Sequence, residues 1–152
     1  MELDGFDFKL LDALQRDASS TNAELGAVVG LSASQISRRR ERLERDGVID
    51  RYQADLNAAK LGFAVTVFIH VTLAAHSAGN AELLRKLIVD TAEIQQAHAM
   101  TGETDYLLRV AIRGLGELSV FVNETLLAHP AVARVRSEIV LETIKDGRLL
   151  AL

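Results

Sequence analysis

Residues 21–49 read TNAELGAVVGLSASQISRRRERLERDGVI, and this stretch decides the fold of the first part of the chain. It contains two helix-start patterns, TNAE at 21–24 and SASQ at 32–35. In such a capping box a hydroxyl accepts from a free backbone N–H, and the Glu or Gln side chain reaches back to the first residue. Gly30-Leu31 forms a short break between the two helices, with room for a tight turn. This layout predicts a helix-turn-helix.

The second of these helices is rich in arginine. The second helix of a helix-turn-helix enters the major groove, so the pattern predicts double-stranded DNA as a partner. The alternative is an ordinary solvated helix whose arginines pair with glutamates three or four residues away. The two capping boxes and the turn between them favour DNA binding. The arginines of this helix are Arg38, Arg39, Arg40, Arg42 and Arg45.

Charge is unevenly distributed along the chain. In total, 17 Lys and Arg oppose 21 Asp and Glu, a net charge of −4. Residues 31–51 hold six arginines against four acids and form a positive segment, whereas residues 1–30 and 52–152 are both acidic. Because DNA affinity depends on a local basic surface facing phosphate, an acidic total does not strongly oppose it.

The start of the arginine-rich helix supplies the predicted DNA contacts. Side chains in the first two turns normally reach base edges, which assigns that role to Ser34, Gln35, Arg38 and Arg39. Three further residues, Ser37, Arg42 and Arg51, are better placed for phosphates, which position a protein without specifying sequence. The full predicted set is Ser32, Ser34, Gln35, Ser37, Arg38, Arg39, Arg42 and Arg51.

The other elements follow from hydrophobic periodicity. Apolar residues at three- and four-residue spacing, including Phe6, predict a first helix over about 4–16. Residues 48–56 are expected to be extended, and strict alternation over 65–73 predicts a strand. The later elements are expected as a helix over 80–91 with Asn80 as N-cap, strands over 94–100 and 105–112, a helix over 116–128 and a strand over 132–144.

The order of these later elements is strand-helix-strand-strand-helix-strand, which predicts a ferredoxin-like domain and an α+β protein. The chain is thus expected to divide into a helix-turn-helix domain at 1–50, an extended linker at 51–62 and a ferredoxin-like domain at 63–152. Helices on one side of the sheet leave its second face partly apolar. A second subunit is expected to cover that face.

The loop TGETDY at 101–106 supports two interpretations. One is a plain hairpin in which Gly102 supplies a positive φ angle. The other is a small-ligand site, in which backbone N–H groups and the Asp105 carboxylate face a zwitterion and the carboxylate suits its ammonium group. The loop alone does not decide between them.

Several classes of protein are excluded or disfavoured. There are no cysteines, and the four histidines do not show metal-ligand spacing, so neither a thiolate nor a metal site is expected. No Ser/His/Asp set is legible, and we expect no enzyme and no cofactor. No run reaches the ~18 apolar residues of a membrane span, and the acidic N-terminus lacks a secretory signal. These observations predict a cytoplasmic protein without a membrane partner.

Four segments together resemble the Lrp/AsnC family of transcriptional regulators. They are LDGFDFKLLDALQRDA near the start, ELGAVVGLSASQISRRRERLERDGVI, TGETDYLLRV and ETLLAHPAV. The resemblance implies a winged-helix-like DNA-binding domain and a ferredoxin-like domain that binds an amino-acid effector. It also implies homodimers packed sheet against sheet, with further assembly to tetramers of dimers. The function implied is sequence-specific transcription regulation in which oligomerisation and DNA binding respond to that effector.

The resemblance places the effector between dimers near the TGETDY loop. The residues implied are His98, Thr101, Gly102, Glu103, Thr104, Asp105, Leu115, Glu138, Ile139 and Val140. Polar groups stand at His98 and Glu138 where many relatives place apolar or aromatic ones. The operator, the direction of regulation and the identity of the effector are not fixed by the sequence.

Two helix residues depart from the family pattern. Arg40 stands where the family usually has an apolar residue, so either its stem passes along the core or the helix rotates and Arg40 joins the basic face. Gly26 stands where Ala is usual, and we expect close approach of the next helix. The main rival function is an architectural DNA protein without a ligand. RNA binding is disfavoured because only 5% of residues are aromatic.

Overall fold

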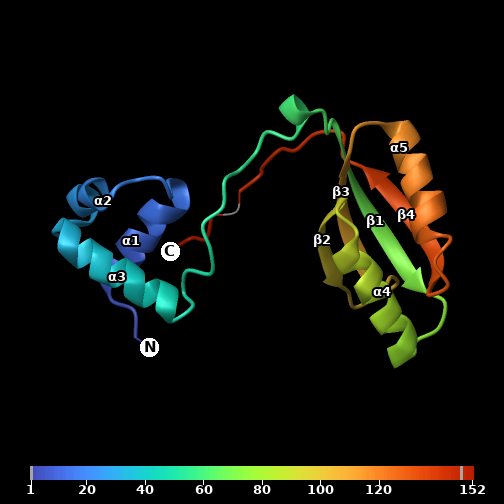
Figure 1. Cartoon of the computed structure of the whole chain (residues 1–152), viewed down its shortest axis with the longest axis horizontal. Coiled ribbons are helices and arrows are strands. Elements are labelled where there is room, and N and C mark those ends of the chain that lie inside the picture. The colour runs from blue at the N-terminus through green and yellow to red at the C-terminus, as the bar shows by residue number, and fades with distance from the viewer. Residues whose placement is uncertain (1, 148) are drawn as a thin grey trace. The chain divides into compact units, whose positions relative to one another are not determined.

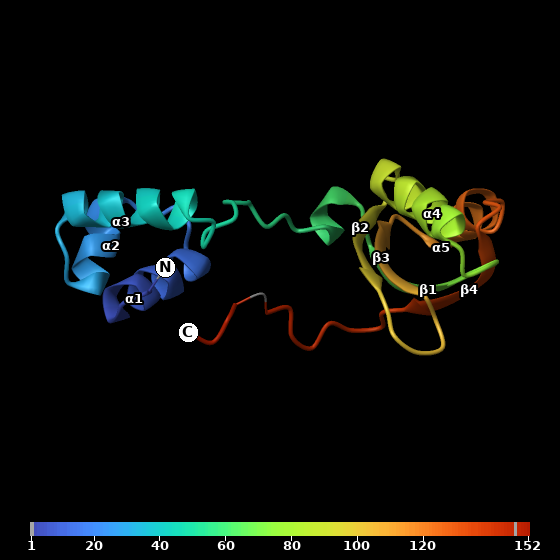
Figure 2. The same cartoon turned by 90° about the horizontal axis from the view of Figure 1, so that it is seen from below.

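The computed structural model describes residues 2–147 and 149–152. The chain forms two compact units (Figures 1 and 2). One comprises Met1–Asp55 together with Lys145–Leu152, and the other comprises Leu56–Ile144. No helix in the described residues is long and apolar enough to cross a membrane.

The N-terminal unit contains three helices, α1 (Gly5–Arg16), α2 (Asn22–Val29) and α3 (Ala33–Arg45). The predicted capping boxes of α2 and α3 are both present. A third box, in which Asp4 and Asp7 bond reciprocally, begins α1 and was not predicted. The three helices share one apolar core made by Leu10, Leu14, Leu25, Val29, Ile36 and Leu43.

The turn between α2 and α3 is tight. Gly30 ends α2 with a φ of 84°, a left-handed conformation that suits glycine. A Cβ on Gly26 would lie 2.5 Å from the carbonyl oxygen of Leu31. The expected close approach is therefore present, but the approaching group is the backbone of the turn rather than the body of α3.

The predicted apolar stripe of α1 needs one correction. Phe6 is 42% exposed, whereas the neighbouring Asp7 is fully buried. Periodicity alone assigns a buried position to the apolar residue. It gives no sign of the arginines of α3 that bond the Asp7 carboxylate in the interior.

The C-terminal unit has a four-stranded antiparallel sheet with the order β2-β3-β1-β4. Two helical segments cover one face of it (Figure 2). This is the predicted ferredoxin-like arrangement. Its elements are a short 3-10 turn η1 (Ala59–Leu61), β1 (Val65–Leu73), α4 (Ala78–Asp90), β2 (Ile94–Ala99), β3 (Tyr106–Ile112), α5 (Leu115–Val120) with its π-helical continuation η2 (Phe121–Leu126), and β4 (Val132–Ile139).

Alternation along β1 separates the two faces of the sheet. Val67, Ile69, Val71 and Leu73 are buried beneath the helices with Leu84 of α4 and other apolar residues. The intervening residues Thr66, Phe68, His70 and Thr72 are half-buried on the open face. The first strand thus follows the predicted pattern closely.

Three element ends differ from prediction. The N-cap of α4 is Ser77, whose hydroxyl accepts from the Asn80 N–H at 3.2 Å, so the helix begins before Asn80. β4 ends at Ile139 rather than near residue 144, and the backbone bond that follows it runs from the Val140 N–H to the Thr66 carbonyl. The last helix is also not uniformly α-helical, since it continues as a π-helix from Phe121.

The C-terminal tail belongs to the N-terminal unit, unlike the single domain predicted for residues 63–152. The side-chain amide of Gln15 on α1 bonds both backbone groups of Leu150. Its Nε2 donates to the Leu150 carbonyl at 2.8 Å, and its Oε1 accepts the Leu150 N–H at 2.9 Å. No local sequence pattern signals this pairing.

Candidate nucleic-acid interface and ligand loop

The first turns of α3 present three exposed polar residues of the predicted DNA-binding set. Ser34, Gln35 and Arg38 are exposed. The Oε1 of Gln35 accepts from the Ser32 N–H at 2.9 Å, so the capping box leaves the amide nitrogen of Gln35 available. Within the described residues, the Arg38 guanidinium forms no ion pair or hydrogen bond. Arg38 is therefore a free positive charge at the start of the helix.

Arg39 lies in a different environment from the base-contacting one expected. Its Nη1 bonds the fully buried Asp7 carboxylate at 2.6 Å and the Asp4 carboxylate at 2.9 Å. Its guanidinium carbon lies 5.5 Å from the centroid of the Phe6 ring. Arg42 joins the same cluster, because its Nη2 bonds Asp7 at 2.5 Å. The charges of both arginines are thus balanced largely within the protein.

The Asp4 carboxyl is part of this cluster and of the α1 cap. The hydrogen bond from the Asp7 backbone N–H holds the pKa of Asp4 below its ordinary value, and Arg39 lowers it further. Both effects stabilise the ionised carboxylate. The Asp4 carboxyl is therefore ionised at neutral pH.

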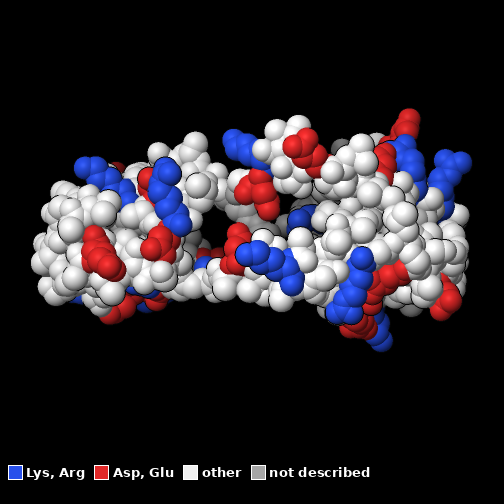
Figure 3. Space-filling model, turned by 90° about the horizontal axis from the view of Figure 1, so that it is seen from above, with Lys and Arg blue, Asp and Glu red and all other residues white. Residues whose placement is uncertain are grey.

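A recess of about 280 Å³ on α3 is lined by Gln35, Arg38, Arg39 and Arg42. Its lining is polar and cationic, which suits a phosphate or the edge of a base. Over the face shown in Figure 3, acidic and basic side chains are interspersed. The recess, in contrast, brings three arginines of α3 together.

The guanidinium of Arg40 points to α2 and to the segment after α3. Its guanidinium carbon lies 5.2 Å from the centroid of the Tyr52 ring, and its Nη1 donates to Asn22 Oδ1 at 3.1 Å. The Tyr52 hydroxyl donates to Glu44 at 2.8 Å. Burial, and then the Glu44 carboxylate, raise the pKa of Tyr52 above its ordinary value of 10.0. Arg40 and Glu44 thus fix the segment that leaves α3.

The remaining predicted phosphate contacts differ in accessibility. The Ser37 hydroxyl donates to Glu41 at 3.0 Å, one turn along the helix. The Arg51 side chain is 74% exposed, and its one ion pair in the described residues is a long one, at 4.0 Å from the adjacent Asp50 carboxylate. Arg51 is consequently free to reorient, whereas the Ser37 hydroxyl must exchange a partner before it can donate to a phosphate.

The β2–β3 loop projects from the sheet (Figure 2). Gly102 has a φ of 125°, and the Met100 N–H donates to the Asp105 carbonyl at 2.8 Å, so the loop closes as a hairpin. The Asp105 carboxylate accepts the Leu73 N–H at 2.8 Å and lies 3.4 Å from His76 Nδ1. One oxygen of this carboxylate, Oδ2, therefore supports the end of β1. The other, Oδ1, faces His76, which the sequence did not single out.

The open face of the sheet carries a polar group around His70. Its Nε2 lies 3.5 Å from Glu138 Oε2, and its Nδ1 lies 3.5 Å from Thr104 Oγ1. Arg136 bonds Glu138 at 3.2 Å. His70 thus joins two predicted effector residues from distant segments, although neither it nor Arg136 was predicted. Strand alternation puts both on this face, but only the β1–β4 register shows that they meet.

Three predicted effector residues lie apart from this group in the single chain. His98 lies on β2 and His70 on β1, and the two are separated by β3, where both pair with Leu107. Leu115 begins α5, beyond the end of β3 that lies farthest from Asp105. Ile139 is in register with Val67 and so belongs to the helix-covered side. The ten predicted residues therefore do not form one site within one chain. In the described part, no cluster of three His, Asp or Glu residues could hold a metal ion.

Comparison with known proteins follows the same division of the chain. The model of the AsnC-type helix-turn-helix domain matches residues 3–44, and that of the Lrp/AsnC ligand binding domain matches residues 66–150. The chain belongs to the Lrp/AsnC family. The N-terminal unit is accordingly its DNA-binding domain, and the C-terminal unit is its amino-acid-binding domain.

Individual Lrp/AsnC proteins are similar over nearly the whole chain. The leucine-responsive regulatory protein of Haemophilus influenzae is 35% identical over 99% of this chain and 90% of its own length. That of Escherichia coli K12 is 34% identical over 99% and 92%. A transcriptional regulator of Neisseria meningitidis, solved in complex with L-Met, superposes with a TM-score of 0.95 at 34% identity, covering 98% of this chain and 96% of that one. These relatives are transcription regulators.

Proposed function

We propose that this Lrp/AsnC protein reads its operator mainly through Arg38, with Ser34 and Gln35 beside it. The observation that carries this proposal is the contrast between neighbouring arginines. Arg39 and Arg42 are bonded to the buried Asp7, whereas Arg38 has no partner in the described residues. A free guanidinium in the first two turns can form the bidentate contact with guanine that is common in the major groove. Arg39 and Arg42 then mainly orient the helix.

The C-terminal unit supports a homodimer as the working form. Its open sheet face carries Phe68 among polar residues, and arginines and a glutamate from β4 lie on the same face. A half-buried face of this kind requires a cover, and an identical face with both charges can pair with itself about a two-fold axis. Further assembly of dimers would bring Leu115 and the β2–β3 loops of different chains within reach of one ligand.

An amino acid would then act by favouring one assembly over another. A ligand shifts such an equilibrium only by its differential affinity for the two states. L-leucine and L-methionine are the first probes, because the relatives named above are leucine-responsive or were solved with L-Met.

Fluorescence anisotropy on the DNA upstream of the gene tests this proposal. Arg38→Ala is expected to weaken specific binding by roughly 1–3 kcal/mol and to relax base preference. Arg45→Ala is the matched control, because it removes the same charge from the last turn of α3, where Arg45 pairs with the adjacent Asp46. Equal losses in the two variants would show that Arg38 contributes charge alone. An unchanged affinity in Arg38→Ala would remove it from the interface.

One observation favours a second function, that of an architectural DNA protein without a ligand. The Asp105 carboxylate is already bonded to the Leu73 N–H, so the loop has a structural role of its own. A thermal-shift series with the twenty amino acids separates the two functions. Stabilisation by one or a few of them supports an effector, and uniform absence of stabilisation supports the architectural role.

A further inference from the structure

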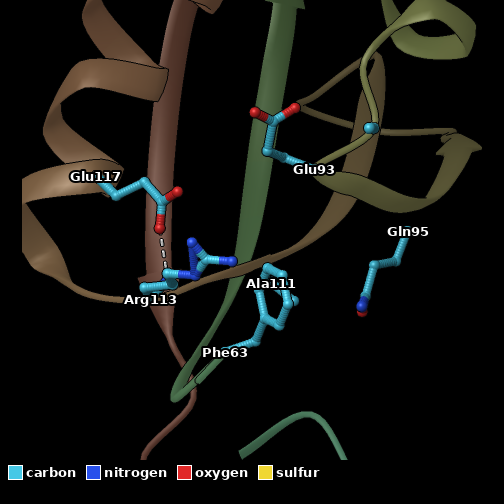
Figure 4. A pocket seen from close by; sticks show the side chains of 7 residues that line it. Phe63, Glu93, Gln95, Ala111, Arg113 and Glu117 are labelled. Carbon is cyan, nitrogen blue, oxygen red and sulfur yellow. Dashed lines mark hydrogen bonds between the residues drawn. The ribbon is translucent and has the colours of Figure 1, made fainter. Parts of the chain in front are cut away.

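A second recess lies in the C-terminal unit, away from the β2–β3 loop (Figure 4). It has a volume of about 350 Å³. It borders the final residues of β3, whereas the loop precedes the first. The seven residues of β3 separate the two places by about 20 Å at ~3.3 Å per residue. The lining residues are Phe63, Ala92, Glu93, Gln95, Ala111, Arg113 and Glu117, none of which belongs to the predicted effector set.

The central feature of this recess is a guanidinium without a carboxylate partner. The Arg113 guanidinium carbon lies 5.0 Å from the centroid of the Phe63 ring, which holds the group by a cation–π interaction. In the described residues it forms no ion pair, although Glu93 and Glu117 line the same recess. The carboxylate of Glu117 instead accepts the backbone N–H of Arg113.

Glu93 supplies the complementary charge. Its carbonyl oxygen accepts the Ala111 N–H at 3.3 Å, which anchors its backbone to β3. Its carboxylate has no hydrogen bond or ion pair within the part of the chain that the structure describes. Figure 4 shows Glu93 and Phe63 on different sides of the Arg113 guanidinium. The recess therefore holds one free cation and one free anion that do not neutralise each other.

Local backbone features create the space between these groups. The β2–β3 register shifts between Ile94 and Gln96, so Gln95 is the extra residue of a bulge, a feature that redirects a side chain. Gln95 Oε1 accepts from Arg109 at 2.8 Å. Ala111 contributes only a methyl group, and a larger side chain there would reduce the recess. Phe63 is held by the bond from its N–H to the Ala58 carbonyl at 2.9 Å.

We propose that this recess is a second binding site for a free α-amino acid. The ligand carboxylate would pair with Arg113, its ammonium with Glu93, and an apolar side chain would contact Phe63 and Ala111. A simple anion meets two glutamates there and a simple cation meets the guanidinium, so a zwitterion best satisfies both charges. The volume lies near the lower end of the roughly 300–1,000 Å³ typical of small-molecule sites, which suits a ligand of this size.

The test follows the methyl NMR signals of Ala92 and Ala111 in the full-length protein. The probe is L-leucine, compared with 4-methylpentanoate, which lacks the amino group, and 3-methylbutylamine, which lacks the carboxylate. L-leucine is expected to shift the two methyl signals with saturation. Each analogue should bind about tenfold more weakly or worse, because it loses one charge-assisted contact.

Substitutions then assign the contacts. Arg113→Gln and Glu93→Gln are each expected to weaken the leucine-dependent shift by about tenfold, and Arg113→Lys should retain part of it. Matched controls are Arg85→Gln and Glu82→Gln, which remove the same charges from exposed positions on α4 and should have no effect.

Two results would overturn the proposal: methyl signals that leucine does not move, or equal binding of leucine and both analogues. Unchanged leucine binding in folded Arg113→Gln would also reject it. The variant Asp105→Asn keeps this experiment separate from the effector loop, because its response at Ala111 should equal that of the unmodified protein. If Asp105→Asn loses DNA regulation but retains the Ala111 shifts, the result concerns the effector role of the β2–β3 loop alone and leaves the proposed second site standing.

Discussion

Asp7 on α1 and Arg39 on α3 form a buried ion pair, with Asp7 Oδ1 2.6 Å from Arg39 Nη1. The second oxygen of Asp7 bonds Arg42. One carboxylate therefore sets the positions of two arginines on α3 and fixes the helix on the body of the domain. The helix can present Arg38 in a constant direction because its neighbours are held.

The first prediction concerns this carboxylate. Asp7→Ala should destabilise the N-terminal unit by about 3–5 kcal/mol, because it leaves two arginines without their buried partner. Urea unfolding followed by tyrosine fluorescence measures the loss. The chain has no Trp and two Tyr, so a Tyr106→Phe background leaves Tyr52 as a probe of this unit. Asp12→Ala, which removes the exposed pair with Arg16 and a hydrogen bond from the Gln15 amide, should have a much smaller effect.

The second prediction concerns the tight turn. Gly26→Ala should lower the free energy of unfolding by about 1–3 kcal/mol, because its Cβ would meet the Leu31 carbonyl oxygen at 2.5 Å. Gly79→Ala in α4 is the control, since a Cβ there meets nothing within 4 Å. That control should be stabilising by about 0.4–1 kcal/mol. If Gly26→Ala also stabilises the protein, the turn backbone can move away at little cost.

The third prediction concerns the stacked pair of Arg40 and Tyr52. A double-mutant cycle with Arg40→Leu and Tyr52→Leu, unfolded in urea, should give a coupling energy of about 0.5–1 kcal/mol. Circular dichroism serves as the probe, because these variants change the reporting tyrosine. Additive effects of the two substitutions would mean that the contact at 5.2 Å contributes nothing to stability.

The fourth prediction concerns pH. The folded pKa of Tyr52 lies above the ordinary 10.0, because burial and the Glu44 carboxylate disfavour the phenolate. Between these two values the unfolded chain loses the proton and the folded chain retains it. Stability from this group is thus complete below about pH 10 and falls as pH rises through the folded pKa. Phenolate absorbance of Tyr106→Phe should show the raised midpoint, and Glu44→Gln should lower it. A midpoint unchanged by Glu44→Gln would leave burial as its cause.

Much of the fold was predictable because its signals are local. The capping boxes at 21–24 and 32–35 lie within single turns, and the alternation along 65–73 reflects the two faces of one strand. The N-cap of α4 was misplaced by three residues, because Ser77 and Asn80 are both good capping residues and the sequence does not rank them.

The site was less predictable because its contacts join distant segments. Asp7 is 32 residues from Arg39, so helical periodicity cannot show that this arginine is held by a carboxylate. Likewise, His70 meets Glu138 only through the register of β1 with β4. Counting arginines predicted that α3 binds DNA but did not distinguish the free arginine of this helix from those that are paired.

The bond between Gln15 and Leu150 also has a consequence for the order in which this protein is completed. The two residues are 135 positions apart. During synthesis the core of the three helices, from Leu10 to Leu43, leaves the ribosome before Leu150 has been translated. The DNA-binding unit can therefore fold early, but its C-terminal segment joins only when translation reaches Leu150. The first domain to form is also among the last to be finished.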